Sequence, residues 1–238
     1  MTSPSTVVRM LHTSDVHITG VDSVNALRSV IDIALETEVD IALIAGDLFD
    51  SSRVADDAVA LVLAELARMS QPVVVIPGNH DCVDEHSIYH RVDLRAAGSH
   101  VFFASDPVGE ELVFEDLALT IWARGIENHE PQHRPLEGYI PTSQPHWRVV
   151  LTHGHYVPTG EASYRSSPIA QQEIAELACD YLALGHWHRY LDVSEGSVRA
   201  FYSGSPWEPI RESGTVNLVT LDADGPRVER LPIAPRPL

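Results

Sequence analysis

Residues 41–50 read IALIAGDLFD, five apolar residues followed by a glycine and by two aspartates that frame a Leu-Phe pair. A short apolar run bounded by glycine is typical of a buried strand. Two neighbouring segments repeat this pattern: the run Val7–Leu11 leads into SDVH at 14–17, and the run Val73–Ile76 leads into PGNHD at 77–81. Three predicted strands in a row therefore end in polar clusters.

Helical stripes separate these three runs. The stretch Val24–Leu35 carries apolar residues at helical spacing, and so does the stretch from Val59 to Met69. Strands that alternate with helices of this length predict βαβ units around a largely parallel sheet.

The second half of the chain is richer in strands and contains only one good helix signal, near Ile169–Leu177. We expect two packed sheets flanked by helices, an α/β fold formed as a single domain over residues 1–238, because this length suits one large core. The segment Glu127–Pro145, rich in Pro, His and Gln, predicts a long surface loop, which we interpret as a solvated connection. The strand-like runs are Leu117–Trp122, Arg148–Thr152, Tyr181–Leu184, Val198–Tyr202 and Val216–Leu221.

The composition is acidic and lacks lysine. The chain has 34 acidic and 16 basic residues, a formal net charge of −18, and every basic residue is an arginine. The lack of lysine excludes a P-loop lysine, Schiff-base and pyridoxal phosphate chemistry, and lysine-dependent kinases. The negative net charge disfavours a binding surface for duplex DNA, which is a polyanion. The 13 histidines point instead to metal binding or acid–base chemistry.

Further features bear on the compartment. The two cysteines, Cys82 and Cys179, lie outside any CxxC pattern, which excludes a thiolate zinc site and leaves one long-range bridge open. No run approaches the roughly 20 apolar residues of a membrane span. The polar start of the chain differs from a secretory signal. We expect a cytoplasmic protein without membrane association, and the sequence carries no indication of its oligomeric state.

Two later runs also end in polar clusters. Val149–Thr152 leads into His153-Gly154-His155, and Tyr181–Leu184 leads into Gly185-His186-Trp187-His188. The carboxyl ends of parallel strands meet at one edge of a sheet, so we expect the clusters to share one crevice. A single histidine or aspartate after a strand is usually a turn former, a cap or a hydrogen-bonded surface residue. Five such clusters in order predict a functional site.

The spacing inside the clusters suggests how an ion is held. In an extended segment, residues two apart face the same way, so we expect Asp15 and His17 to face one ion. His186 and His188 should do the same, while Trp187 between them points away. A glycine before three of the candidate ligands allows a sharp turn close to an ion or a phosphate. Oxygen and imidazole ligands without thiolate suit Mn, Fe or Zn rather than Ca.

The ordered clusters read as DxH, GDxxD, GNHD, a strand-ending His and GHxH, and from Asp15 to His188 the chain resembles the calcineurin-like metallophosphoesterase superfamily. The resemblance implies a four-layer α/β/β/α sandwich with two divalent or trivalent metal ions, Mn²⁺ first, with Fe or Zn as alternatives. It implies that His80 is a proton donor oriented by Asp81. The implied metal ligands are Asp15, His17, Asp47 and His188 for one ion, and Asp47, Asn79, His153 and His186 for the other, with Asp47 shared.

Within the superfamily, the segments AGDLFDS at 45–51 and YSGSP at 202–206 are most similar to the bacterial DNA-repair exonucleases. Those nucleases continue into a DNA-capping domain and a segment that binds an ATPase partner, whereas this sequence stops soon after the last predicted strand. The similarity therefore supports the chemistry more firmly than the substrate.

We accordingly expect a hydrolase, a dinuclear-metal phosphodiesterase that cleaves a nucleotide or another small phosphodiester with a metal-bridging hydroxide. Arg53 and His155 are candidate substrate contacts, and we prefer His153 to His155 as the metal ligand because it follows the strand directly. The first alternative is a nuclease acting on single strands or ends, with a partner that supplies cationic surface. A non-enzymatic interaction module is a third hypothesis, which the complete ligand set argues against. The candidate nucleic-acid contacts are Arg53, Trp122, Arg124, Trp187 and Trp207, although core aromatics and solvated arginines are the commoner explanation.

Overall fold

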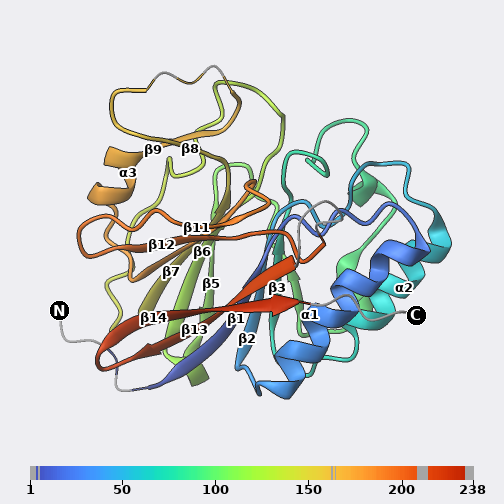
Figure 1. The fold of residues 1–238 in the computed structure, drawn as a ribbon, viewed down its shortest axis with the longest axis horizontal. Helices are drawn as coiled ribbons and strands as arrows, with labels where there is room; N and C mark the ends of the chain where they lie inside the picture. The colour runs from blue at the N-terminus through green and yellow to red at the C-terminus, as the bar shows by residue number, and fades with distance from the viewer. Residues whose placement is uncertain (1–3, 5, 162, 164, 208–213, 234–238) are drawn as a thin grey trace.

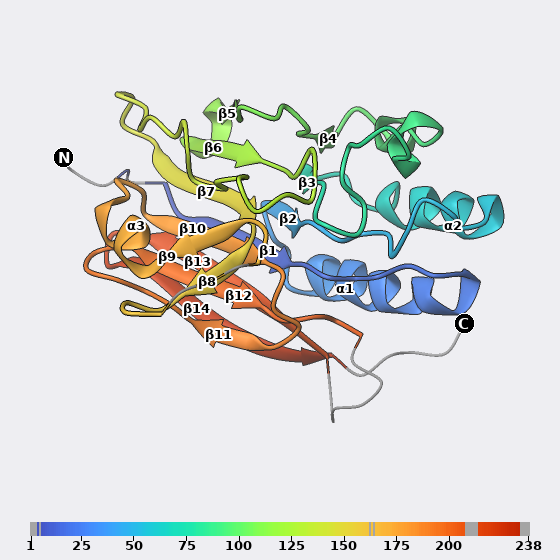
Figure 2. The ribbon, with the colours of Figure 1, turned by 90° about the horizontal axis from the view of Figure 1, so that it is seen from above.

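The computed structural model describes residues 4, 6–161, 163, 165–207 and 214–233. In this part of the chain, two six-stranded mixed sheets lie against each other (Figures 1 and 2). The first sheet has the order β14-β13-β1-β2-β3-β4 and comprises β1 (Val8–Thr13), β2 (Ile41–Ala45), β3 (Val73–Ile76), β4 (Val101–Phe103), β13 (Gly214–Asp222) and β14 (Gly225–Ile233). The second has the order β11-β12-β10-β7-β6-β5 and comprises β5 (Glu110–Phe114), β6 (Leu119–Arg124), β7 (Trp147–His153), β10 (Tyr181–Gly185), β11 (Tyr190–Asp192) and β12 (Arg199–Ser203).

Helices cover the outer faces of the two sheets. Figure 1 shows α1 (Val24–Glu36) and α2 (Asp56–Leu66) on the right, beside the first sheet, and α3 (Gln171–Glu176) on the left, beside the second. A small parallel pair, β8 (His155–Val157) and β9 (Pro168–Ala170), precedes α3. The predicted α/β/β/α sandwich is confirmed, with a thin fourth layer because α3 has only six residues.

The hydrophobic core lies in layers that follow the alternation of each strand. On β1, Met10 packs between the two sheets, whereas its neighbour Leu11 packs under the helices with Leu27 of α1. On β10, Tyr181 packs between the sheets, and Leu182 packs on the outer face. Because successive strand residues point to opposite faces, both faces of the central strands are apolar.

The central strands of each sheet are parallel, so the loops that follow them lie at the same edge of the sheet. β1 pairs with β2 and β2 with β3 in parallel, while in the second sheet β7 pairs with β10 in parallel. The bounds predicted for β2 and β3 are confirmed, and both strands are buried at every position. The segment from 125 to 146 contains neither helix nor strand, as expected.

Several elements differ from the sequence expectations. The second helix ends at Leu66 rather than near Met69, and the third is shorter than expected because Ile169 belongs to β9. The sequence pattern also missed β4, β5, β8, β9, β11 and β14. Three residues give too short a periodic signal for most of these, and β5 and β14 are edge strands whose exposed positions interrupt the apolar pattern.

Two further observations complete the fold. Cys82 and Cys179 are free and buried, so the bridge that the sequence left open is not formed. Among the helices that the structure describes, none combines the length and the apolar character needed to cross a membrane.

Candidate metal centre

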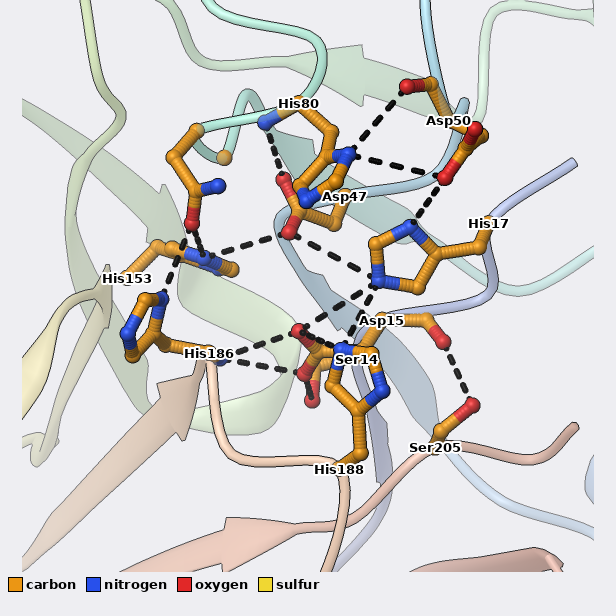
Figure 3. A network of polar contacts seen from close by, with 12 residues as sticks. Ser14, Asp15, His17, Asp47, Asp50, His80, His153, His186, His188 and Ser205 are labelled. Carbon is orange, nitrogen blue, oxygen red and sulfur yellow. Dashed lines mark hydrogen bonds and ion pairs between the residues drawn. The ribbon is translucent and has the colours of Figure 1, made fainter. Parts of the chain in front are cut away.

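Five loops meet in the region drawn in Figure 3, each following a strand of one of the two sheets. Three of them follow β1, β2 and β3, and two follow β7 and β10. Backbone hydrogen bonds join the loops: Asp15 N donates to Gly46 O at 3.0 Å, and His17 N donates to Asp47 O at 3.0 Å. The structure thus brings the predicted polar clusters to one place.

The backbone has a positive φ angle at four of the seven candidate ligands. The φ angles are 54° at Asp15, 51° at His17, 54° at Asp47 and 112° at His186. Such angles are uncommon for residues other than glycine, and they gather at functional sites. The expected extended spacing is therefore wrong for Asp15-x-His17 and for His186, because left-handed turns rather than an extended pleat aim these side chains inward.

One group of side chains surrounds the Asp15 carboxylate. His17 Nε2 and His188 Nε2 are 3.0 Å apart, and they lie 3.9 and 3.8 Å from Asp15 Oδ1. His17 Nδ1 contacts Asp50 Oδ1 at 3.1 Å, so its Nε2 is the nitrogen that faces the group. Burial, with a smaller contribution from His188, lowers the pKa of His17, which keeps its ring neutral near pH 7.

A second group surrounds the Asn79 amide. Asn79 Oδ1 lies 3.0 Å from His153 Nε2 and 2.9 Å from His186 Nδ1. His153 Nδ1 is 2.8 Å from the carbonyl oxygen of Ala45 and donates to it, which leaves Nε2 with a lone pair. Burial and the neighbouring His153 lower the pKa of His186 to about 3, so this ring too is a neutral lone-pair donor.

Asp47 lies between the two groups. Its Oδ2 is 3.5 Å from His153 Nε2 and 3.8 Å from His17 Nε2, while its Oδ1 accepts a hydrogen bond from His80 N at 2.8 Å. Burial, followed by the charges of Asp15 and Asp81, raises the pKa of Asp47 well above its usual value. For Asp15, burial acts in the same direction, but His153 and His188 outweigh it and the pKa is lowered.

Two glycines permit the close approach of these loops. A Cβ at Gly78 would lie 2.2 Å from Asp47 Oδ1 and 2.5 Å from Asp47 N. A Cβ at Gly185 would lie 1.9 Å from Ala45 O and 2.7 Å from His153 Nδ1. The glycines before candidate ligands therefore make room for other parts of the site, in addition to any bound ion or phosphate.

The surroundings of His80 differ from the expectation. His80 Nδ1 lies 3.2 Å from the carbonyl oxygen of Asp50 and 3.5 Å from its Oδ1 (Figure 3). Asp81 instead accepts from Gly78 N at 2.7 Å and from Phe49 N at 3.1 Å. The expectation that Asp81 orients His80 is wrong, because Asp81 is buried and its oxygens are engaged by backbone amides. Asp50 takes that place.

Asp50 is the site residue that single-residue reasoning passed over, because an aspartate in this position is usually a turn former. Its signal was present as the last residue of GDLFD. Asp50 contacts both His17 and His80, and its side chain is 41% exposed, so it lies at the rim of the site rather than beneath it.

Three serines, Ser14 and two from the YSGSP segment, support Asp15. Ser14 Oγ donates to Asp15 Oδ2 at 2.5 Å and lies 3.0 Å from Ser203 Oγ. Ser205 Oγ donates to the carbonyl oxygen of Asp15 at 2.6 Å. The YSGSP segment thus holds the first cluster in place from the end of β12, a role that the sequence reading did not assign.

The remaining candidates lie around the site without joining it. His155 stacks on Trp187 with ring centroids 5.3 Å apart, and its ring is 5.7 Å from that of His186. This geometry favours His153 over His155 beside Asp47. Arg53 is exposed, and no side-chain partner is found for it among the described residues. Trp207 is partly buried against the core.

The long loop after β6 passes near the site. His129 lies near enough to His80 and His153 for their charges to act with burial in lowering its pKa. Part of the loop that we interpreted as a solvated connection therefore lies near the site, although His129 itself is exposed.

The donor set fits metal ions. His153 Nε2 and Asn79 Oδ1 present lone pairs to each other at 3.0 Å, a contact that a cation between them would satisfy. Two buried carboxylates close together also need positive charge to remain ionised. Among the described residues, three groups of His and Asp atoms could hold an ion: Asp15, His17 and His188; Asp15, Asp47 and His153; and, towards the rim, His17, Asp50 and His80.

Two packed sheets of an α/β sandwich thus bring Asp, His and Asn side chains together at the strand ends, the arrangement of a phosphoesterase. The family model of the calcineurin-like phosphoesterases matches residues 8–190. The chain therefore belongs to the calcineurin-like phosphoesterase family, and the predicted resemblance is confirmed.

Similar proteins agree with this assignment. The DNA double-strand break repair protein Mre11 of Methanosarcina acetivorans is 24% identical, over 96% of this chain and 39% of its own length. The Mre11 of Methanosarcina mazei is 25% identical over the same shares. This chain thus spans about two fifths of the length of these relatives. The protein TT1561 of Thermus thermophilus has the same fold, with a TM-score of 0.61 at 14% identity, over 96% of this chain and 100% of that one. An archaeal phosphodiesterase gives 0.56 at 16% identity, over 94% and 99%.

Proposed function

We propose that this hydrolase is a dinuclear-metal phosphodiesterase that acts on a nucleotide or another small phosphodiester. The observation that carries the proposal is the position of Asp47, whose Oδ2 faces His17 on one side and His153 on the other. A carboxylate placed between two groups of imidazoles is suited to join two ions. Mn²⁺ is the first candidate, with Fe or Zn as alternatives.

The seven ligand residues would hold the ions in two groups. Asp15, His17 and His188 belong to the first, Asn79, His153 and His186 to the second, and Asp47 to both. Two divalent ions bound there supply Lewis acidity at the phosphoryl oxygens and lower the pKa of water.

His80 is the proposed acid that protonates the leaving alcohol. Its Nδ1 faces the Asp50 carbonyl and carboxylate, so its Nε2 is the nitrogen left for the leaving oxygen. The backbone N–H of His80 donates to Asp47 Oδ1, which fixes the acid relative to the shared ligand. The Asp81 carboxylate accepts hydrogen bonds from backbone amides of the loops after β2 and β3. It also accepts a hydrogen bond from the Tyr89 hydroxyl at 2.7 Å. We propose Arg53 and His155 as substrate contacts at the rim.

The experiment that tests this function uses purified protein loaded in turn with Mn²⁺, Fe²⁺ and Zn²⁺. It measures hydrolysis of bis-p-nitrophenyl phosphate, cyclic nucleotides and labelled single-stranded DNA. We expect metal-dependent hydrolysis of bis-p-nitrophenyl phosphate and of at least one cyclic nucleotide. A protein that binds the ions and hydrolyses no phosphodiester would contradict the proposal and favour the interaction module.

A nuclease is the second candidate, because the Mre11 relatives align with 96% of this chain. The described residues offer it limited support. Arg124 is only 9% exposed and donates to the carbonyl oxygens of Pro107 and Arg134 at 2.8 Å, and Trp122 is buried in the core. Of the candidate nucleic-acid contacts, Arg53 is exposed, and Trp187 and Trp207 are partly buried. Metal-dependent degradation of single-stranded DNA that weakens steeply with salt would favour this alternative.

A further inference from the structure

A small pocket of about 160 Å³ lies directly beside His80 and contains none of the seven proposed metal ligands. It is formed by the loop after β2 and the loop that follows β3. Seven polar residues contribute to its wall: Ser51, Ser52, His80, Asp81, Asp84, His86 and Ser87.

The wall of this pocket is rich in groups that bind hydroxyls. Ser87 Oγ accepts from Tyr89 N, and Ser51 Oγ accepts from Arg53 N, so both hydroxyl protons remain for donation. No hydrogen-bond partner is found for Ser52 Oγ among the described residues. The Asp84 carboxylate adds an acceptor on the same wall.

The size of the pocket limits what can enter it. At about 30 Å³ per water molecule, its volume corresponds to roughly five waters. Pockets that enclose drug-sized ligands measure about 300–1,000 Å³. A glycerol or the polar edge of a pentose fits this space, whereas a nucleobase together with its sugar does not.

We propose that this pocket receives the leaving alcohol of the phosphodiester and selects a compact, polyhydroxylated one. The inference rests on the proposed function, because it places the leaving group at the proton donor. In the reaction the P–O bond to this alcohol breaks, the oxygen of water forms the new P–O bond, and His80 gives a proton to the leaving oxygen. The pocket wall donates to and accepts from the remaining hydroxyls of the alcohol.

The test uses the full chain loaded with Mn²⁺ and two symmetric diesters, bis(glyceryl) phosphate and diethyl phosphate, followed by phosphorus NMR. Symmetry makes the leaving alcohol unambiguous, and both alcohols leave as basic alkoxides. A polar wall that pairs with hydroxyls should give the wild type at least about a tenfold higher kcat/KM on the glyceryl diester.

Variants of the pocket wall decide the assignment. Ser52→Phe fills the pocket without touching the backbone carbonyl of Ser52, which accepts from Arg91. It should remove the preference while changing the rate on diethyl phosphate by less than about twofold. The matched control is Ser99→Phe, which should keep the preference. Ser99 is exposed in the turn before β4, and this strand runs parallel to β3, so the turn lies at the end of the sheet away from the site loops. The second variant is His86→Ala, which removes an exposed side chain from the pocket wall and inserts no bulky group. It should reduce the preference for the glyceryl diester.

The outcomes separate this inference from the proposed function. Equal rates of the wild type on both diesters, or equal slowing of both by Ser52→Phe and His86→Ala, would overturn the pocket assignment and leave the phosphodiesterase in place. A loaded wild type that hydrolyses neither diester, nor bis-p-nitrophenyl phosphate, would overturn the function itself and the pocket assignment with it.

Discussion

At the scale of single residues, Asp47 belongs to both proposed ion positions because one of its oxygens faces His17 and His153 together. In the proposed ligand set, His17, His188 and Asp15 contribute to one position only, although Asp15 also lies within reach of Asp47 and His153. Loss of Asp47 should therefore affect the binding of both ions, whereas loss of another ligand should mainly affect one.

Asp47→Ala should lose most of both ions, because it removes the carboxylate that the two positions share. Elemental analysis of the purified protein measures the ions per chain. Asp224→Ala, an exposed carboxylate at the turn between β13 and β14, is the control and should keep its metal content. An Asp47→Ala protein that retains both ions would show that the bridging assignment is wrong.

His80→Ala should leave the metal content intact and slow hydrolysis by an amount that depends on the leaving group. For an alkyl or nucleoside leaving group the loss should approach the upper end of about 10²–10⁴-fold, because the basic alkoxide needs a proton. For p-nitrophenolate, which is stable as an anion, the loss should be far smaller. Rates on substrates of both kinds measure the difference.

Asn79→Ala provides the contrast, since it should weaken one ion and slow both kinds of substrate alike. Equal slowing of both by His80→Ala, at unchanged metal content, would count against the acid role. His80 would then be an electrostatic contact to the phosphoryl oxygens.

At the scale of elements, the site depends on loops that pack against one another without room for extra atoms. The loop after β3 passes over Asp47 at Gly78, and the loop after β10 passes over Ala45 at Gly185. The parallel pairing of β1, β2 and β3 sets the spacing of these loops.

Gly78→Ala should weaken metal binding, because the new Cβ would lie 2.2 Å from Asp47 Oδ1 and 2.5 Å from Asp47 N. Overpacking of this kind typically costs about 1–3 kcal/mol of folding free energy. Metal titration and chemical denaturation of the metal-free protein measure the two effects.

Gly20→Ala is the matched control, because nothing lies within 4 Å of a Cβ there and the backbone is extended. Its unfolding free energy should stay within about 0.5 kcal/mol of the wild type. If Gly78→Ala bound metal as the wild type does, the packing account of this loop would be wrong.

At the scale of the whole molecule, a polar residue lies inside the core between the two sheets. His12 of β1 is fully buried, and its Nδ1 lies 2.8 Å from the hydroxyl of Tyr181 on β10. Burial lowers the pKa of His12 to about 3, although the nearby backbone of Leu184 and the charge of Asp15 act the other way.

This histidine should make stability sensitive to acid. Its pKa is lower in the folded state than the value of about 6.5 in the unfolded chain, so its contribution is complete above pH 6.5 and is lost as pH falls towards 3. Between pH 7 and pH 5 the loss should be about 2 kcal/mol of unfolding free energy. Denaturation of the metal-free protein at both values measures it.

His12→Gln keeps a hydrogen-bonding group towards Tyr181 and removes the titration. Its unfolding free energy should therefore fall by about 2 kcal/mol less than that of the wild type over the same interval. Parallel losses in the two proteins would show that His12 is not a source of the acid sensitivity.

The local sequence pattern was sufficient to predict part of the fold and of the site. Apolar runs five and four residues long predicted β2 and β3 to the residue, since fully buried strands are apolar on both faces. The GDLFD, GNHD and GHWH clusters predicted which side chains gather, because parallel strands deliver their ends to one edge. Short strands such as β4 and β11 were not predicted, since three residues carry too little periodicity.

The sequence by itself determined the chemistry of the site, because the types of ligand and their positions after the strands are local features. Only the tertiary structure decided which groups act together. His17 and His188, 171 residues apart, meet through the packing of two sheets, and Asp50 rather than Asp81 reaches His80. Left-handed turns at Asp15 and Asp47, and the pocket beside His80, arise in the same way. Such contacts depend on how loops from different strands pack against one another, and no periodicity along one strand encodes that packing.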